Sequence, residues 1–128
     1  MADSLELARS ILENLPPVAD TAPMVQVAAA KALRRHGFDV ILEYPVEGGR
    51  IDIVASWDDW RVAIEIDARK PRARSLLKLR AFQGATIVAL RGVTALLPEG
   101  IDAVANIPVR TALEAERADR RIVSRMRA

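Results

Sequence analysis

The sequence contains no cysteine and only one histidine, His36. The absence of cysteine excludes disulfide bonds, thiolate metal sites and a cysteine nucleophile. A single histidine argues against zinc sites built from several histidines and, less strongly, against a serine–histidine triad. Because His36 stands next to Gly37, we expect it to form only the last turn of a helix. The charged residues are therefore the ones that matter most for chemistry.

Long apolar runs are missing as well, since none approaches the roughly 18 residues that a membrane span requires. The N-terminal stretch MADSLELARSILENL is acidic and amphipathic, unlike a signal peptide. Hydrophobic residues make up 51% and charged residues 28% of the 128 residues, which predicts a globular chain long enough for one core. We therefore expect one cytoplasmic domain over residues 1–128 with no membrane partner.

Acidic residues are absent from one stretch, although the net charge of the chain is only +2. Residues 69–80 are rich in lysine and arginine and contain no aspartate or glutamate. Such a stretch is typical of a phosphate-binding surface, and also of a solvent-exposed loop and helix. The candidate nucleic-acid contacts are Arg69, Lys70, Arg72, Arg74, Lys78 and Arg80.

Hydrophobic periodicity and turn residues predict a chain that alternates between helices and strands. Helices are expected at about residues 3–15, 24–36, 73–83 and 109–127. Strands are expected at about residues 38–46, 50–57, 60–66 and 85–90, with one or two short strands between 91 and 109. The core order is therefore helix, three strands, helix, strand.

The second and third strands are separated only by Asp58-Asp59, so they should form a hairpin in which Trp57 faces Trp60. In that register Asp52 lies directly opposite Glu65. Cross-strand neighbours have Cβ atoms about 4.5–5.5 Å apart, so these like charges need a cation or a shared proton. Two convergent carboxylates suit a hard cation such as Mg²⁺ or Mn²⁺.

The same register places Asp67 opposite Arg50, on the face that carries Glu65. A salt bridge between Asp67 and Arg50 is one role for this acid, and help in holding a second ion is another. The opposite face of the hairpin is expected to be apolar and to carry Ile51, Ile53, Val62, Ile64 and Ile66.

These strands resemble the PD-(D/E)XK nuclease superfamily, in particular archaeal Holliday-junction resolvases and small phage nucleases. The resemblance runs from about Met24 to Leu90, and its signature lies in GGRIDIVA (48–55) and AIEID (63–67). It implies an α/β fold with a restriction-endonuclease-like core of a helix, a three-strand meander, a helix and a strand. This core would cover about residues 22–107, with extra helices at about 3–15 and 109–127. Many resolvase-like relatives are homodimers, and we expect the terminal helices to carry any such interface.

By this resemblance Asp52 is the metal-binding aspartate and Glu65 the second acidic ligand, with the Ile66 carbonyl completing the inner shell. The superfamily's usual lysine, two residues after the second acid, is replaced here by Asp67. In some members that lysine lies on the following helix. Lys70 and Lys78 are the candidates for this relocation, and Lys78 is favoured because its helix should pack beside the strands.

Other polar and aromatic residues are weaker candidates. Many relatives carry a glutamate on the first core helix, where this chain offers only Gln26, a neutral and weaker ligand. Glu43, late in the strand expected at 38–46, is an alternative metal ligand, but we expect it at a surface or edge position. Trp57 and Trp60 are expected to clamp the hairpin as a cross-strand pair, with stacking on an unpaired base as the alternative.

The resemblance implies a divalent-metal-dependent DNA endonuclease that hydrolyses phosphodiester bonds, whether phage-related or specific for a DNA structure. The basic stretch 69–80 directly follows the acidic strand, so it would bind phosphates beside the metal. Two alternatives stay open. The chain is either an inactive member that binds nucleic acid through its basic helix, or a protein-interaction module that uses the fold as a scaffold.

Overall fold

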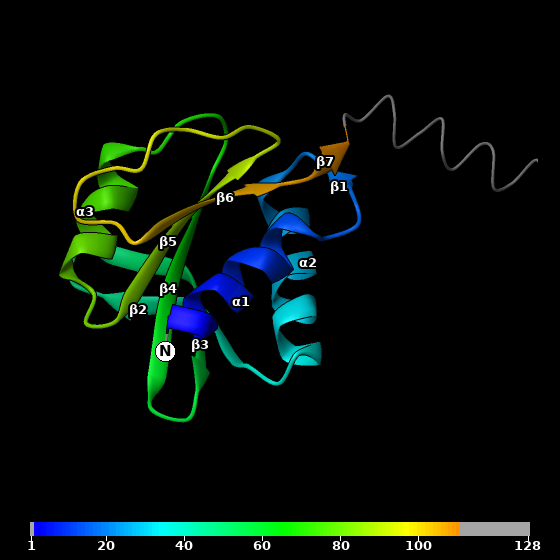
Figure 1. Ribbon diagram of the computed structural model, residues 1–128. Helices are drawn as coiled ribbons and strands as arrows, with labels where there is room; N and C mark the ends of the chain where they lie inside the picture. The colour runs from blue at the N-terminus through cyan, green and yellow to red at the C-terminus, as the bar shows by residue number, and fades with distance from the viewer. Residues whose placement is uncertain (1, 111–128) are drawn as a thin grey trace, which may run out of the picture.

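The computed structural model describes residues 2–110 of the chain. These residues form a mixed α/β fold whose main sheet has five strands. Helices α1 (Ala2–Glu13) and α2 (Ala22–Arg35) cover one face of this sheet, and α3 (Ala73–Ala81) covers the other (Figure 1). The α/β class predicted from the sequence is confirmed.

Helix α2 begins and ends at residues that the sequence marks. The Thr21 side chain accepts a hydrogen bond from the Met24 amide at 3.4 Å, and Pro23 lies in the first turn. The helix ends at Arg35 and His36 is its C-cap, one residue earlier than the expected helix end, and Gly37 follows with φ +96, a conformation that glycine adopts without strain. None of the helices in residues 2–110 has the length and apolar character that a membrane span needs.

The five strands of the main sheet are ordered β2-β3-β4-β5-β6. Their bounds are Asp39–Val46, Gly49–Trp57, Trp60–Asp67, Ala85–Arg91 and Ala103–Ile107. Strands β2 to β4 form an antiparallel meander, whereas β5 and β6 run parallel to β4. Helix α3 makes the crossover from β4 to β5, so the element order is the predicted one, with β6 added at the edge.

A second, small sheet joins two distant parts of the chain. It pairs β1 (Val18–Ala19), which was not predicted, with β7 (Val109–Arg110), which begins at the end of the stretch 91–109 where one or two short strands were expected; the two run in parallel. The prediction of a helix from about residue 109 is therefore wrong for Val109 and Arg110. The rest of that expected helix lies outside the described residues.

The β3–β4 hairpin has the predicted register near its turn. Trp57 pairs with Trp60, and the ladder continues to Ile53 opposite Ile64. Both indole rings pack around the buried Phe38, with ring centroids 5.5 Å and 6.2 Å from it. The tryptophans therefore clamp the hairpin, as expected.

Beyond Ile53 the strands change their pattern, and the predicted apolar face is wrong at Ile51. Ile53 packs in the core beneath α1 and α2, whereas Ile51 packs in the core beneath α3. The neighbouring strand does the same, because Leu42 contacts the first core and Tyr44 the second. On β2, the change from one face of the sheet to the other occurs at Glu43. This residue has φ +52 and lies outside the paired positions of the β2–β3 ladder.

Candidate functional site

Asp52 lies where the regular pairing of β3 is interrupted. Its Oδ2 accepts a hydrogen bond from the Ile66 amide at 2.7 Å, so its carboxylate replaces a backbone partner on the adjacent strand. The side chain lines a cavity of about 220 Å³ between the start of α2, strands β2 to β4 and the loop before α3. The other lining residues are Ala22, Pro23, Gln26, Glu43, Ile66 and Arg72.

Glu65 is close to Asp52, as the register predicted, but its carboxylate contacts the Asp52 amide and Lys78 and does not lie in the cavity. Its Oε2 accepts a hydrogen bond from the Asp52 amide at 2.9 Å, and its Oε1 forms an ion pair with the Lys78 amine. The residue is only 1% exposed and does not line the cavity. Burial raises the pKa of the Glu65 carboxyl to about 7, against the opposing effects of Lys78 and of the Asp52 amide.

Lys78 reaches this acid from α3. Its amine donates a hydrogen bond to the Arg50 carbonyl at 2.7 Å in addition to its ion pair with Glu65. Lys70, the other candidate for a relocated lysine, is exposed in the loop that precedes α3. Of the two lysines, the structure thus brings Lys78 to the second acid.

Asp67 has both carboxylate oxygens engaged at the start of α3. Oδ1 accepts from the Arg72 Nε at 2.7 Å and from the Ser75 hydroxyl at 2.9 Å, and Oδ2 accepts from the Arg72 amide at 2.9 Å. The predicted salt bridge with Arg50 is wrong, because Asp67 pairs with Arg72 while its strand lies beside Leu90 of β5. These bonds raise the pKa of the Arg72 guanidinium, which therefore stays charged.

Five of the six basic candidates in residues 69–80 divide into two groups, and the sixth, Lys70, is exposed in the loop before α3. Arg72 lines the cavity, and the Arg74 and Lys78 side chains both pass over Gly49, where an added Cβ would lie 3.3 Å from the Arg74 guanidinium. Arg69 instead forms a 2.6 Å ion pair with Asp20, and Arg80 donates to the Glu99 carbonyl at 2.9 Å. The predicted phosphate contacts that remain beside the acids are therefore Arg72, Arg74 and Lys78.

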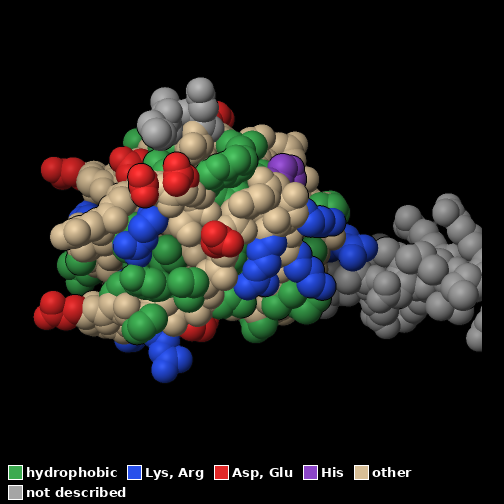
Figure 2. All heavy atoms as spheres, turned by 90° about the horizontal axis from the view of Figure 1, so that it is seen from below, with side chains coloured by type: hydrophobic (Ala, Val, Ile, Leu, Met, Phe, Trp, Pro, Cys, Tyr) green, Lys and Arg blue, Asp and Glu red, His purple; other side chains and the backbone are tan. Residues whose placement is uncertain are grey.

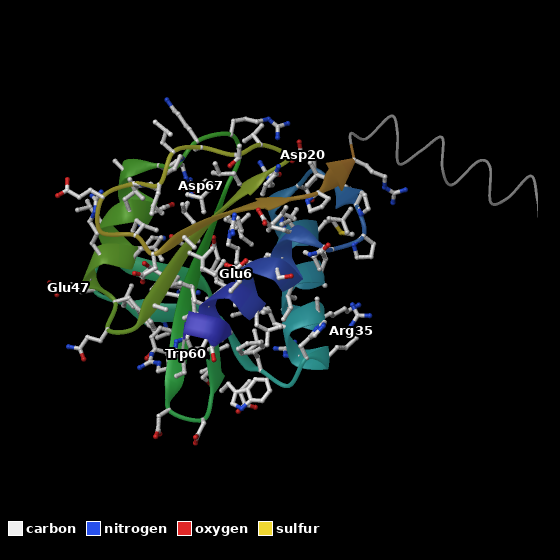
Figure 3. All side chains as sticks on the ribbon, viewed as in Figure 1. Glu6, Asp20, Arg35, Glu47, Trp60 and Asp67 are labelled. Atoms are coloured by element: carbon white, nitrogen blue, oxygen red, sulfur yellow. The ribbon has the colours of Figure 1, made fainter. Side chains whose placement is uncertain are left out.

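A separate basic group lies at the end of α2, where Arg34 and Arg35 precede His36. Figure 2 shows the histidine, in purple, on the face seen from below, with lysine or arginine side chains near it. Figure 3 places Trp60 and Asp67 at opposite ends of β4, so the hairpin tip is remote from the acids. The tryptophans are thus badly placed to stack on a base bound at the cavity.

Two residues that the sequence treated as weak candidates belong to the cavity. The Gln26 amide nitrogen donates to the Glu43 Oε1 at 3.0 Å and to the Asp52 carbonyl at 2.9 Å. Glu43 is exposed, yet its side chain lines the cavity with Asp52. The sequence could have indicated this position for Glu43. Extending the pairing of β2 and β3 from their turn places position 43 opposite position 52.

The donor set decides which cation would fit. No group of three or more histidine, cysteine, aspartate or glutamate side chains converges among residues 2–110. The cavity does offer two carboxylates, Asp52 and Glu43, and no nitrogen or sulfur ligand of the kind that zinc prefers. Mg²⁺ is commonly held by one or two carboxylates while keeping several waters. The residues present therefore fit a hydrated Mg²⁺ or Mn²⁺ ion.

Comparison with protein-family models, with curated proteins and with solved structures finds no significant match for this chain.

Proposed function

We propose that this protein is a divalent-metal-dependent nuclease that hydrolyses phosphodiester bonds in DNA, on a restriction-endonuclease-like core. One observation carries the proposal. Where β3 and β4 stop pairing, the Asp52 carboxylate lines a cavity together with the Arg72 guanidinium, and the buried Glu65–Lys78 ion pair adjoins Asp52. Carboxylates that hold a hard cation and cations that bind a phosphate are the two requirements of this chemistry.

The residues of the site have distinct roles in this proposal. Asp52 would hold a Mg²⁺ or Mn²⁺ ion, which when bound would supply a Lewis acid for the phosphate and lower the pKa of a water. Arg72 binds a phosphate oxygen at the mouth of the cavity, and its raised pKa keeps it charged at any working pH. The Lys78 amine, set between Glu65 and the Arg50 carbonyl, places positive charge next to Asp52 and so stabilises negative charge at the site.

The choice of DNA rests on the positive side chains next to the cavity. Arg72 is the N-cap of α3, Arg74 lies in its first turn and is exposed, and Lys78 lies one turn further, in the last turn. Backbone phosphates supply most of the sequence-independent affinity for DNA, and each such contact makes binding sensitive to salt. We therefore expect binding to weaken with salt and to depend on Arg74.

A non-catalytic role is the second candidate, as a nucleic-acid-binding or protein-interaction module. The observation in its favour is that Glu65 and Asp67 are both satisfied by side chains of the protein, Lys78 and Arg72 respectively. Acids that are neutralised internally do not require a metal for stability.

One assay separates these candidates. The full chain is incubated with supercoiled, linear and four-way-junction DNA, with and without Mg²⁺ or Mn²⁺. Metal-dependent cleavage that Asp52→Asn lowers by about 10³-fold, the equivalent of several kcal/mol of transition-state stabilisation, supports the nuclease. The matched control is Asp59→Asn, which changes an exposed acid at the hairpin turn and should cleave normally.

The same experiment covers the alternatives. Salt-sensitive binding without cleavage, lost in Arg74→Ala but retained in Arg35→Ala, would favour the binding module over the nuclease. Absence of both binding and cleavage with every DNA would leave only the protein-interaction module.

A further inference from the structure

Glu43 is an unusual residue in the middle of a strand. Its φ of +52 lies in the left-handed region, which a residue other than glycine rarely adopts. Its neighbours Leu42 and Tyr44 pair normally with Ile53 and Ile51 of β3, so only Glu43 and Asp52 leave the ladder. The result is that the side chains of positions 43 and 52 line the same cavity.

Gln26 ties these two positions together from a third element, helix α2. Its amide nitrogen donates to the Glu43 carboxylate at 3.0 Å and to the Asp52 carbonyl at 2.9 Å. The side chain itself lines the cavity, as does Pro23 one turn earlier on the same helix. One carboxamide therefore fixes the Glu43 side chain relative to the backbone that carries Asp52.

Glu65 is a poorer second ligand than Glu43 in this arrangement. Both of its oxygens are engaged, one by the Asp52 amide and the other by Lys78, and the residue is only 1% exposed. A cation in the cavity would have to break the buried ion pair to reach it. Glu43 already lines the cavity, and its Oε1 accepts a hydrogen bond from the neutral Gln26 amide and is not held in a buried ion pair as Glu65 is.

We propose that Glu43, rather than Glu65, is the second carboxylate ligand of a Mg²⁺ or Mn²⁺ ion bound through Asp52, and that Gln26 is the residue that positions Glu43. This inference rests on the proposed nuclease function and names the metal centre of that same cavity. Two carboxylates give the cavity a formal charge of −2, which Arg72 only partly offsets, so a hydrated divalent cation is the complementary ligand.

The test is a titration of the metal-free full chain with MnCl₂, followed by calorimetry and by the electron paramagnetic resonance signal of free Mn²⁺. Glu43→Gln keeps the size of the side chain and an oxygen that accepts from Gln26, so the fold should survive. We expect this change to weaken Mn²⁺ binding by at least about tenfold, and Glu65→Gln to weaken it by less than about threefold. Glu47→Gln, an exposed glutamate at the β2–β3 turn labelled in Figure 3, is the matched control and should bind normally.

The role of Gln26 has its own readout. Gln26→Leu should lower Mn²⁺ affinity by about tenfold or more, as is typical when a residue that orients a ligand is removed. Gln26→Glu loses the donor to Glu43 but adds an oxygen ligand, so it should bind Mn²⁺ better than Gln26→Leu does. Unchanged Mn²⁺ affinity in Gln26→Leu would contradict the positioning role.

The outcomes separate this inference from the proposed function. Normal Mn²⁺ binding in Glu43→Gln, together with loss of binding in Glu65→Gln, would overturn the assignment of Glu43 while leaving the nuclease intact. Absence of Mn²⁺ binding by the unmodified chain, with or without a DNA oligonucleotide, would overturn both.

Discussion

The two ends of the β3–β4 hairpin are built differently. At the turn, backbone pairing is regular from Trp57 and Trp60 to Ile53 and Ile64, and the side chains that hold it are aromatic and aliphatic. At the open end, a side chain replaces the backbone as hydrogen-bond acceptor, because the Asp52 carboxylate accepts a hydrogen bond from the Ile66 amide of the opposite strand. The hairpin thus changes from a structure held by packing to one held by charge and hydrogen bonds within about four residues.

This difference has a physical cause in the partners available at each end. The turn end can bury its apolar side chains against Phe38 and needs no compensation. The open end buries Glu65, and burying a carboxylate costs several kcal/mol unless a cation is paired with it. Lys78 of α3 supplies that cation, so the open end depends on a helix that follows the hairpin in sequence.

The largest expected effect comes from removing this cation. Lys78→Met keeps most of the side-chain volume but leaves Glu65 buried and unpaired. We expect the free energy of unfolding at pH 8 to fall by about 3–5 kcal/mol, measured by urea denaturation. Arg74→Met, one turn earlier on α3, should cost far less because that side chain is exposed.

The double variant Lys78→Met/Glu65→Gln sharpens this prediction. Without a charge to bury, it should recover most of the stability that the single lysine variant loses. A double variant no more stable than Lys78→Met would show that the open end is held by something other than this ion pair.

The next effect is a pH dependence of the free energy of unfolding that arises from Glu65 at the open end. The pKa of Glu65 is about 7 in the folded chain and near 4.5 in the unfolded chain, so the folded state binds more protons between these values. The free energy of unfolding should therefore fall as the pH rises from 4.5 to 7, by up to about 1.4 kcal/mol per pH unit. Urea denaturation in EDTA at several pH values measures this slope.

Glu65→Gln provides the control, since it removes the titrating group while keeping the shape. Most of the decline in stability across this pH window should disappear in that variant. An unchanged slope would assign the pH dependence to another group and remove Glu65 as its source.

A smaller effect is expected at Asp67, where the same strand meets α3. Asp67→Asn keeps an oxygen that accepts from the Arg72 amide but loses the charge facing the guanidinium. Because Arg72 is 65% exposed, the loss should be only about 1 kcal/mol in the free energy of unfolding. Asp67 itself is buried, so a loss as large as that of Lys78→Met would show that this pair with one exposed partner is as important as the Glu65–Lys78 pair.

The sequence predicted the turn end of the hairpin better than the open end, because the turn end depends on local features and the open end on contacts with distant residues. The Asp58-Asp59 turn and the alternation on both sides of it are local features, and together they gave the correct register from Trp57 to Ile53. The proximity of Asp52 and Glu65 followed from that register. Their hydrogen-bond partners did not follow, because they come from α3 and from the backbone of the facing strand.

Other misses have the same origin in distant contacts. Where the ladder skips Glu43 and Asp52, Ile51 packs on the α3 side of the sheet and Ile53 on the other, which simple alternation cannot anticipate. The pairing of Val18 with Val109 joins residues 91 positions apart, and each of these two strands is too short to give a pattern. The helices and the longer strands of the main sheet, by contrast, were predicted from local periodicity and caps.

The smallest expected effect lies at the hairpin turn and tests whether its two ends are independent. Trp57 is 48% exposed and meets Phe38 edge-on, so Trp57→Thr, which keeps a strand-forming residue, should cost roughly 0.5–1 kcal/mol of unfolding free energy. Mn²⁺ affinity should not change, because the cavity lies at the other end of the strands and shares no lining residue with the aromatic cluster. A several-fold weakening of Mn²⁺ binding in Trp57→Thr would show that the regular ladder from Trp57 to Ile53 is needed to hold Asp52 in place. The charged network around Lys78 would then not be sufficient on its own.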